Sequence, residues 1–202
     1  MQAETLPIRV IKVGGSLLTL PDLKQRLMEW AGTIADDRCV NVWIVGGGAF
    51  VDEVRNWQAL HGLDPNLAHR ISIGLMSQTA ELFQGMFLDW PLLLDIQSLN
   101  PDALGATSNV VFDCCHWAQN NVAVQRSWET TSDTISLQLA IAVGASHLFL
   151  LKSKSPKSDR VIEAIEDGLI DRNFSSGCTQ ESRLRTSMVN LRESNTAIEL
   201  LW

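Results

Sequence analysis

Two glycine-rich turns are the first residues in this sequence whose types and spacing could bind a ligand. The first turn is made of Gly14, Gly15 and Ser16, and the second of Gly46, Gly47 and Gly48. Glycine lets a backbone approach a ligand closely, and the amides at the start of a following helix attract anions, above all phosphate. One such turn is most simply a tight turn. Because both turns follow apolar runs typical of strands, they favour a phosphate-rich ligand.

Lys12 lies just before the first turn, in the otherwise apolar run Ile8–Val13. A buried ammonium is unfavourable unless it meets an anion, so this lysine is a candidate for stabilising charge on a phosphate. The competing interpretation is a lysine that reaches solvent from an edge strand. Its position alone does not decide between the two.

A second polar cluster precedes an apolar helical segment. It contains Thr130, Thr131, Ser132, Asp133 and Thr134. Serine, threonine and aspartate accept the first amide hydrogens of a helix, so helix capping explains part of this run. The run has more polar groups than one cap uses. Asp133 is therefore also a candidate for orienting a lysine or a metal-bound phosphate.

Two better-known nucleotide motifs do not fit the sequence. No G-x-x-x-x-G-K-[ST] loop is present, which excludes P-loop binding. The second turn has Val51 where the dinucleotide fingerprint G-x-G-x-x-G needs its third glycine. Dinucleotide binding remains only as a weaker alternative.

The elements that would position these residues alternate along the chain. Apolar runs predict strands at residues 8–13, 40–45, 92–95, 109–112, 122–124 and 147–151, and helical spacing predicts helices at 21–36, 51–60, 67–87 and 132–143. A polar loop follows at 152–160, and only short apolar pieces come after it, at 188–191 and 198–201. The alternation predicts an α/β fold with a mainly parallel sheet covered by helices on both faces.

The length and composition predict one globular domain over residues 1–202. We also expect this domain in the cytoplasm, for the reasons given below. Hydrophobic residues make up 46% and charged residues 19%, with a mean hydropathy of +0.05, which excludes disordered and fibrous chains. The apolar runs are too short to span a membrane, and the first ten residues lack the pattern of a signal peptide. A net charge of −7 disfavours nucleic acid and anionic lipid as partners.

The four cysteines are expected to be reduced and to bind no metal. They are Cys39, Cys114, Cys115 and Cys178, and their spacing does not match a zinc site. Trp128, just before the polar cluster, is expected in the core.

Taken together, four separated motifs resemble the amino acid kinase family, which includes acetylglutamate, aspartate and uridylate kinases. They are IKVGGS, IVGGGAFVDEVR, SDTISLQLAIAVGA and HLFLLKS, and the match runs in order from about residue 8 to 174. More narrowly, WETTSDTISLQLA, AHRISIGLM and EDGLIDRNF are similar to the small branch that contains the aminomethylfuranyl-methyl phosphate kinase of methanofuran biosynthesis.

The resemblance implies a three-layer αβα sandwich that transfers a phosphoryl group from ATP, with Mg²⁺, to a small anionic acceptor. The catalytic pair would be Lys12, which neutralises charge on the transferring group, and Asp133, which organises the lysine. ATP and its phosphates would be bound by Gly14, Gly15, Ser16, Ser132, Thr134 and Lys152. The acceptor would be bound by Gly46, Gly47, Gly48 and Arg70, the last through its planar guanidinium. Family members commonly dimerise, so a homo-oligomer is also expected.

The sequence departs from the family pattern at one place. Residues 152–158, KSKSPKS, stand where many relatives have a Val-Asp-Gly nucleotide loop, and no second lysine is evident beyond it. Lys154, Lys157 and Arg160 could add positive charge there, or the loop could be solvated surface.

The function that follows is an ATP-dependent kinase, most simply one that converts a phosphate monoester into a diphosphate in one-carbon cofactor (methanofuran-type) biosynthesis. The alternative is a binding or regulatory module of the same fold that has lost turnover.

Overall fold

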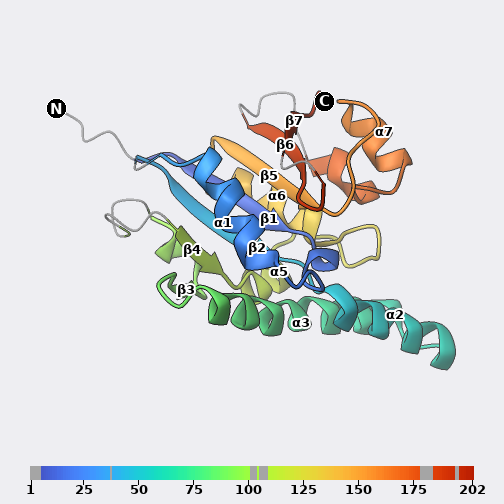
Figure 1. Ribbon diagram of the computed structural model, residues 1–202. Coiled ribbons are helices and arrows are strands. Elements are labelled where there is room, and N and C mark those ends of the chain that lie inside the picture. The colour runs from blue at the N-terminus through green and yellow to red at the C-terminus, as the bar shows by residue number, and fades with distance from the viewer. Residues whose placement is uncertain (1–5, 37, 101–103, 105–108, 178–183, 194–195) are drawn as a thin grey trace.

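A seven-stranded sheet forms the centre of the molecule (Figure 1). The computed structural model describes residues 6–36, 38–100, 104, 109–177, 184–193 and 196–202. The strands are β1 (Ile8–Val13), β2 (Val40–Val45), β3 (Leu92–Leu93), β4 (Asn109–Phe112), β5 (His147–Lys152), β6 (Arg185–Asn190) and β7 (Ala197–Glu199). Their order is β3-β4-β2-β1-β5-β6-β7, and every neighbouring pair is parallel except β6 with β7. The carboxyl ends of β1, β2 and β5 therefore meet at one edge of the sheet.

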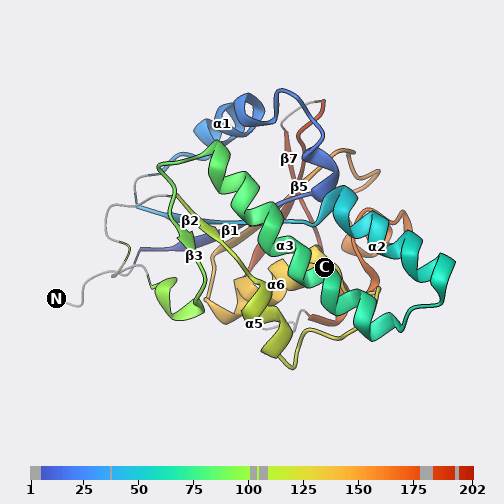
Figure 2. The ribbon, with the colours of Figure 1, turned by 90° about the horizontal axis from the view of Figure 1, so that it is seen from below.

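Helices cover both faces of this sheet. They are α1 (Leu23–Thr33), α2 (Gly48–His61), α3 (Pro65–Met86), α5 (Cys115–Asn120), α6 (Ser132–Ala142) and α7 (Val161–Glu166), with short 3-10 helices η1 (Gly15–Leu17), η2 (Ile96–Ser98) and η3 (Arg172–Gly177). Figure 2 shows α1 on one face of the sheet and α5 and α6 on the other. Buried side chains of α1 pack on the first face and those of α5, α6 and α7 on the second, while α3 contributes to both layers. The predicted three-layer α/β architecture is confirmed.

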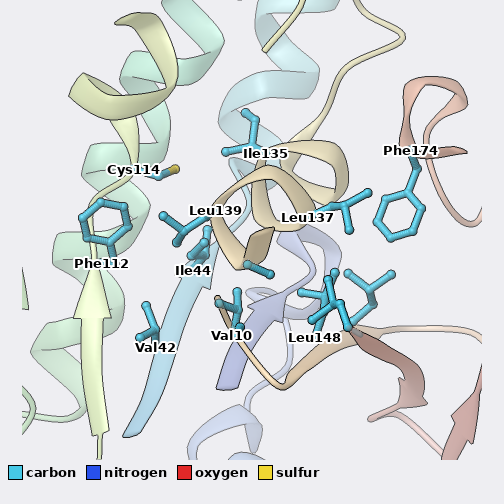
Figure 3. Close-up of a cluster of buried hydrophobic side chains, with 14 of the residues drawn as sticks. Val10, Val42, Ile44, Phe112, Cys114, Ile135, Leu137, Leu139, Leu148 and Phe174 are labelled. Carbon is cyan, nitrogen blue, oxygen red and sulfur yellow. The ribbon is translucent and has the colours of Figure 1, made fainter. Parts of the chain in front are cut away.

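The strand period of two decides which side chains reach α6. In β1, Val10 packs in the core beneath α6, together with Leu148 of β5 and Leu137 and Leu139 of the helix (Figure 3). Successive strand residues point to opposite faces. Lys12, two residues after Val10, therefore lies on the same face and nearer the carboxyl end of the strand. The strand thus carries its lysine toward the start of α6.

The opposite face has an aromatic core. The ring of Trp30 from α1 meets that of Trp43 of β2 edge-on at 6.1 Å and that of Phe149 of β5 at 5.2 Å. Trp30 and Trp43 are fully buried. Edge-to-face contacts of this kind add to the stabilisation from burial alone, so this cluster fixes α1 on the sheet.

Most predicted elements are present, with corrections at the short ones. The strands at 8–13, 40–45 and 109–112 have the predicted bounds, and the strand at 147–151 extends to Lys152. The predicted strand at 122–124 is wrong: the Asn121 side chain accepts from the Ala123 amide and makes a turn, which leaves Val122 99% exposed. Only Leu92–Leu93 of the predicted strand 92–95 pairs with a neighbour, and α5 and α7 are helices that periodicity did not reveal.

The helix predicted at 51–60 is present as α2, but none of its residues is buried. Its apolar positions Phe50, Trp57 and Leu60 are exposed. The spacing correctly indicated a helix but not a face packed on the core.

Cys39, Cys114 and Cys115 are free thiols, as predicted, while Cys178 lies outside the described residues. In the part of the chain that the structure describes, no helix is both long and apolar enough to cross a bilayer.

We predict that Trp30→Ala lowers the free energy of unfolding by about 3–5 kcal/mol, because it leaves a cavity between α1 and the sheet. The matched control is Trp57→Ala in α2, which removes the same side chain from an exposed position. It should change the free energy of unfolding by less than about 0.5 kcal/mol. Denaturant unfolding of both variants measures the difference. Equal losses would contradict the assignment of Trp30 to the core.

Candidate active site

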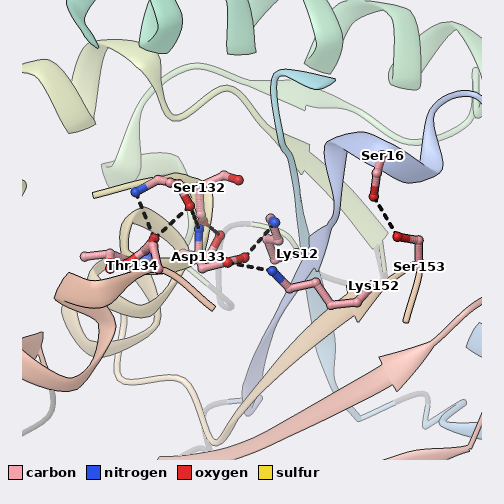
Figure 4. A network of polar contacts seen from close by, with 10 residues as sticks. Lys12, Ser16, Ser132, Asp133, Thr134, Lys152 and Ser153 are labelled. Atoms are coloured by element: carbon pink, nitrogen blue, oxygen red, sulfur yellow. Dashed lines mark hydrogen bonds and ion pairs between the residues drawn. The ribbon is translucent and has the colours of Figure 1, made fainter. Parts of the chain in front are cut away.

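A buried cluster of two lysines and one aspartate lies where β1, β5 and α6 meet (Figure 4). The Nζ atom of Lys12 is 2.6 Å from Oδ1 of Asp133, and the Nζ atom of Lys152 is 2.5 Å from Oδ2. The side chains of Lys12 and Asp133 are each 5% exposed, and that of Lys152 is 13% exposed. Each carboxylate oxygen therefore binds one ammonium group.

Strand register explains how the two lysines converge. Lys12 of β1 pairs with Leu150 of β5, so Lys152 lies two residues further along β5. A shift of two keeps a side chain on the same face, and diagonal neighbours of this kind are within reach of long side chains. Because β1 lies between β2 and β5 in the sheet, the alternative of a lysine reaching solvent from an edge strand is wrong.

Asp133 is free to face the lysines because another residue caps α6. The N-cap is Thr131, whose side chain accepts a hydrogen bond from the Asp133 backbone amide at 3.3 Å. The carboxylate of Asp133 is directed to the sheet instead. The capping interpretation therefore does not account for the side chain of Asp133.

Burial and mutual attraction set the protonation of the cluster. Burial disfavours the charged carboxylate of Asp133, but attraction to Lys12 and Lys152 outweighs it and lowers its pKa to about 2. Burial lowers the pKa of Lys152 to about 8, although attraction to Asp133 opposes this shift. At neutral pH the aspartate is fully ionised and Lys152 is mostly protonated.

The two glycine turns pack directly against each other beside this cluster. A Cβ atom added to Gly15 would lie 2.2 Å from the amide nitrogen of Gly48, and one added to Gly14 would lie 2.8 Å from the carbonyl oxygen of Leu151. Gly48 also has a left-handed backbone, with φ of +56°. The glycines thus allow the turns after β1 and β2 to meet, in addition to any approach to a ligand.

A cavity of about 660 Å³ opens in front of the cluster and both turns. Lys12, Lys152 and Asp133 line it together with Gly15, Ser16, Gly47, Gly48 and Ser132. Its volume is in the range of sites for small molecules and cofactors. The structure therefore brings most of the residues proposed from sequence into one cavity.

The lining of the cavity also includes an arginine stacked on an aromatic ring. The guanidinium of Arg55 lies over the ring of Trp128 at 4.7 Å, and the Trp128 indole donates to the side-chain oxygen of Gln58. The buried His69 donates through Nε2 to the carbonyl oxygen of Thr130 at 3.1 Å, since a carbonyl can only accept. Burial lowers the pKa of His69, which keeps it neutral. Trp128 was expected in the core but lines the cavity.

Some residues proposed from sequence lie elsewhere. Arg70 is exposed and does not line the cavity, whereas Arg55 and Arg172 do. Thr134 is buried and donates its hydroxyl to Asp171 rather than facing the cavity. Gly14 and Gly46 support the turns from behind the cavity wall.

Asp171 is the site residue that sequence reasoning did not assign. Its carboxylate accepts from the backbone amide of Thr131 at 2.8 Å, the Thr131 hydroxyl at 2.7 Å, the Thr134 amide at 3.0 Å and the Thr134 hydroxyl. It lies in the EDGLIDRNF segment, 37 residues beyond Thr134. No local spacing signals a cap supplied from so far along the chain.

The cluster also limits how a nucleotide and Mg²⁺ would be held. Both oxygens of Asp133 accept from lysines and those of Asp171 from α6, so a metal ion would compete with these hydrogen bonds for either carboxylate. Among the described residues, no group of three or more acidic, cysteine or histidine side chains is arranged for a metal. Mg²⁺ would therefore be held mainly by phosphate oxygens and water, as is usual for this ion.

We predict that Gly15→Ala lowers the free energy of unfolding by roughly 1–3 kcal/mol, because the new Cβ collides with the backbone of Gly48. Gly74→Ala in α3 is the matched control. Nothing lies within 4 Å of its added Cβ, and alanine should raise the stability of the helix by about 0.5–1 kcal/mol. Thermal or denaturant unfolding tests the pair, and a stabilising Gly15→Ala would argue against close packing of the two turns.

We further predict that Lys152 titrates near pH 8 and that Asp133→Asn lowers its pKa, because the attraction that stabilises the ammonium is lost while burial and Lys12 remain. NMR titration of protein with ¹³C-labelled lysine measures this, and Lys152→Gln identifies the signal. A Lys152 pKa that Asp133→Asn leaves unchanged would contradict the ion pair.

The fold matches that of several solved kinase structures. Uridylate kinase from Archaeoglobus fulgidus superposes with a TM-score of 0.63 at 17% identity, covering 96% of this chain and 90% of that one. UMP kinase from Ureaplasma parvum gives 0.60 at 14% identity, covering 95% and 92%. Aspartate kinase from Synechocystis gives 0.54 at 13% identity, covering 96% and 40%. No family model and no curated protein sequence matches the chain. The likeness therefore establishes a shared fold, that of the amino acid kinases.

Proposed function

We propose that this protein is an ATP-dependent phosphotransferase that acts on a small anionic acceptor. The observation that carries the proposal is the buried Lys12–Asp133–Lys152 cluster in front of two glycine turns, at the carboxyl ends of parallel strands. Ligands of open α/β sheets bind at this edge. The shared fold with uridylate and aspartate kinases supports the same reaction class.

The cluster is suited to stabilise a transferring phosphoryl group. Each ammonium has three N–H donors, and Asp133 takes one from each lysine. The remaining donors of Lys12 and Lys152 can bind phosphoryl oxygens, whose charge spreads over the group in the transition state. Asp133 fixes the direction of both lysines before the substrates bind, so little reorganisation is needed.

The two buried carboxylates of the site, Asp133 and Asp171, are poor general bases, which favours an acceptor that is already ionised. Asp133 has a pKa of about 2 and both its oxygens are engaged, so it is a very weak proton acceptor. Asp171 accepts four hydrogen bonds. His69 donates through Nε2 to a backbone carbonyl, which leaves its Nδ1 unprotonated and without a partner in the described part of the chain. An alcohol would need to lose a proton, whereas a carboxylate or phosphate oxygen is already ionised. Arg55 also lines the cavity, where it pairs with Asp52 at 2.9 Å, and it would bind such an acceptor by exchanging that partner.

The narrower parts of the proposal rest on the sequence resemblance. A phosphate monoester as acceptor, a diphosphate as product and a role in one-carbon cofactor biosynthesis come from the similarity to the methanofuran branch. A homodimer is likewise proposed from the family. The competing module without turnover was suggested by the altered nucleotide loop and the missing second lysine. Lys152 of β5, beside Asp133, supplies a second lysine to the cluster, which favours the active enzyme.

We predict that Lys12→Ala lowers kcat about 10²- to 10³-fold and changes the KM for ATP much less, because the charge is needed most in the transition state. Lys154→Ala, which removes an exposed lysine of the loop after β5, is the control and should keep full activity. Turnover is measured with ATP and Mg²⁺ against phosphate monoesters, carboxylates and alcohols. Full turnover by Lys12→Ala, or turnover of alcohols alone, would count against the proposal.

A further inference from the structure

Asp171 joins two segments that are distant in sequence at the start of α6. Its carboxylate accepts four hydrogen bonds, from the amides and hydroxyls of Thr131 and Thr134. Asp133 lies between these two threonines in the first turn of the helix. Whatever holds both threonines also fixes the position and direction of Asp133.

The residues beside Asp171 extend this connection. The amide of Asn173 donates to the Glu129 carbonyl at 3.0 Å, and its side chain donates to the Thr130 hydroxyl at 2.8 Å. The guanidinium of Arg172 lies 3.6 Å from the Glu129 carboxylate. Residues 171–173 are thus bound along residues 129–131, the loop that leads into α6.

The environment of Asp171 disfavours its ionised carboxylate, which indicates a role beyond helix capping. Burial and the nearby charge of Asp133 raise the pKa of Asp171, although the hydrogen bonds from the two threonines oppose this. A threonine N-cap alone can satisfy the first amides of a helix without a second carboxylate. The four charged groups Lys12, Lys152, Asp133 and Asp171 together balance to zero.

We propose that Asp171 is a positioning residue of the phosphoryl-transfer site: it anchors the first turn of α6 so that Asp133 faces both lysines. This inference rests on the proposed function for its kinetic consequences. Asp171 itself contacts neither lysine, and it acts through Thr131, Thr134 and Asp133. Its negative charge also favours the protonated form of Lys152.

The test compares Asp171→Ala with Asp171→Asn. We expect Asp171→Ala to lower kcat by about 10- to 100-fold with a smaller change in the KM for ATP, because a misplaced Asp133 misdirects the lysines. Asp171→Asn should recover part of kcat, since an amide oxygen can still accept from the two backbone amides. The melting temperature of Asp171→Ala should fall by about 2–4 °C, the change for one lost cap in a chain of this size.

The matched control is Asp167→Ala in the same segment. Asp167 pairs with Lys157 on the surface, at 2.7 Å, and its loss should leave kcat unchanged. The proposal is overturned if Asp171→Ala lowers the melting temperature but keeps full kcat at temperatures where the variant is folded. Asp171 would then be only a structural cap. If that variant does not fold, Thr134→Val, which removes one donor and keeps the charge, decides by the same criterion.

A readout without turnover separates this inference from the proposed reaction. NMR titration of ¹³C-labelled lysine in the absence of nucleotide should give a lower Lys152 pKa in Asp171→Ala than in Asp171→Asn, because both variants lose the charge and only asparagine still holds the first turn of α6. That result in a protein without ATP turnover would refute the proposed function and leave the role of Asp171 intact. Equal Lys152 pKa values in the two variants would overturn the positioning role.

Discussion

The architecture depends on placing one buried carboxylate between two buried ammonium groups. Removing such charges from water is unfavourable, and only close contacts with good geometry offset it. That requirement fixes the neighbours: β1 and β5 must be adjacent, their lysines must share a face, and α6 must begin directly above them. The turns after β1 and β2 then need glycine to fit into the remaining space. A cluster that contributes little net stability is better explained by what it binds than by the fold it supports.

Much of the fold was predictable because the central strands are short β-branched runs that end at glycine. β1 and β2 have the predicted bounds for this reason. Prediction failed where local pattern and environment disagree. Residues 122–124 read as a strand but have no neighbouring strand to pair with, and the Asn121 side chain favours a turn. The apolar spacing of α2 predicted a buried face, whereas burial depends on what lies opposite the helix, which periodicity cannot reveal.

The candidate site was predictable in its parts but not in its connections. Lys12 and Asp133 stood out as charged groups in apolar or capping contexts. Lys152 was assigned to the phosphates of ATP from the family resemblance and not to a pair with Asp133, although its parity with Leu148 and Leu150 indicates the inward face of β5. Asp171 had no local signal, because a cap from a distant segment exists only once the chain is folded. The choice of Arg70 over Arg55 shows the same limit, since a helix register does not say which side faces a cavity.

The position of β1 has a consequence for how the chain acquires its native structure. β1 is the first strand in sequence, yet it pairs on one side with β5, and Lys12 finds Asp133 121 residues further along. Such non-local contacts make folding slow, since a long loop must close before they form. During synthesis, one edge of β1 has no partner until β5 has been made, and an unpaired apolar edge invites association with other chains. Until α6 has been made and has packed on β1, Lys12 lacks its counter-ion Asp133, and its charge opposes the burial of that edge in any incorrect pairing.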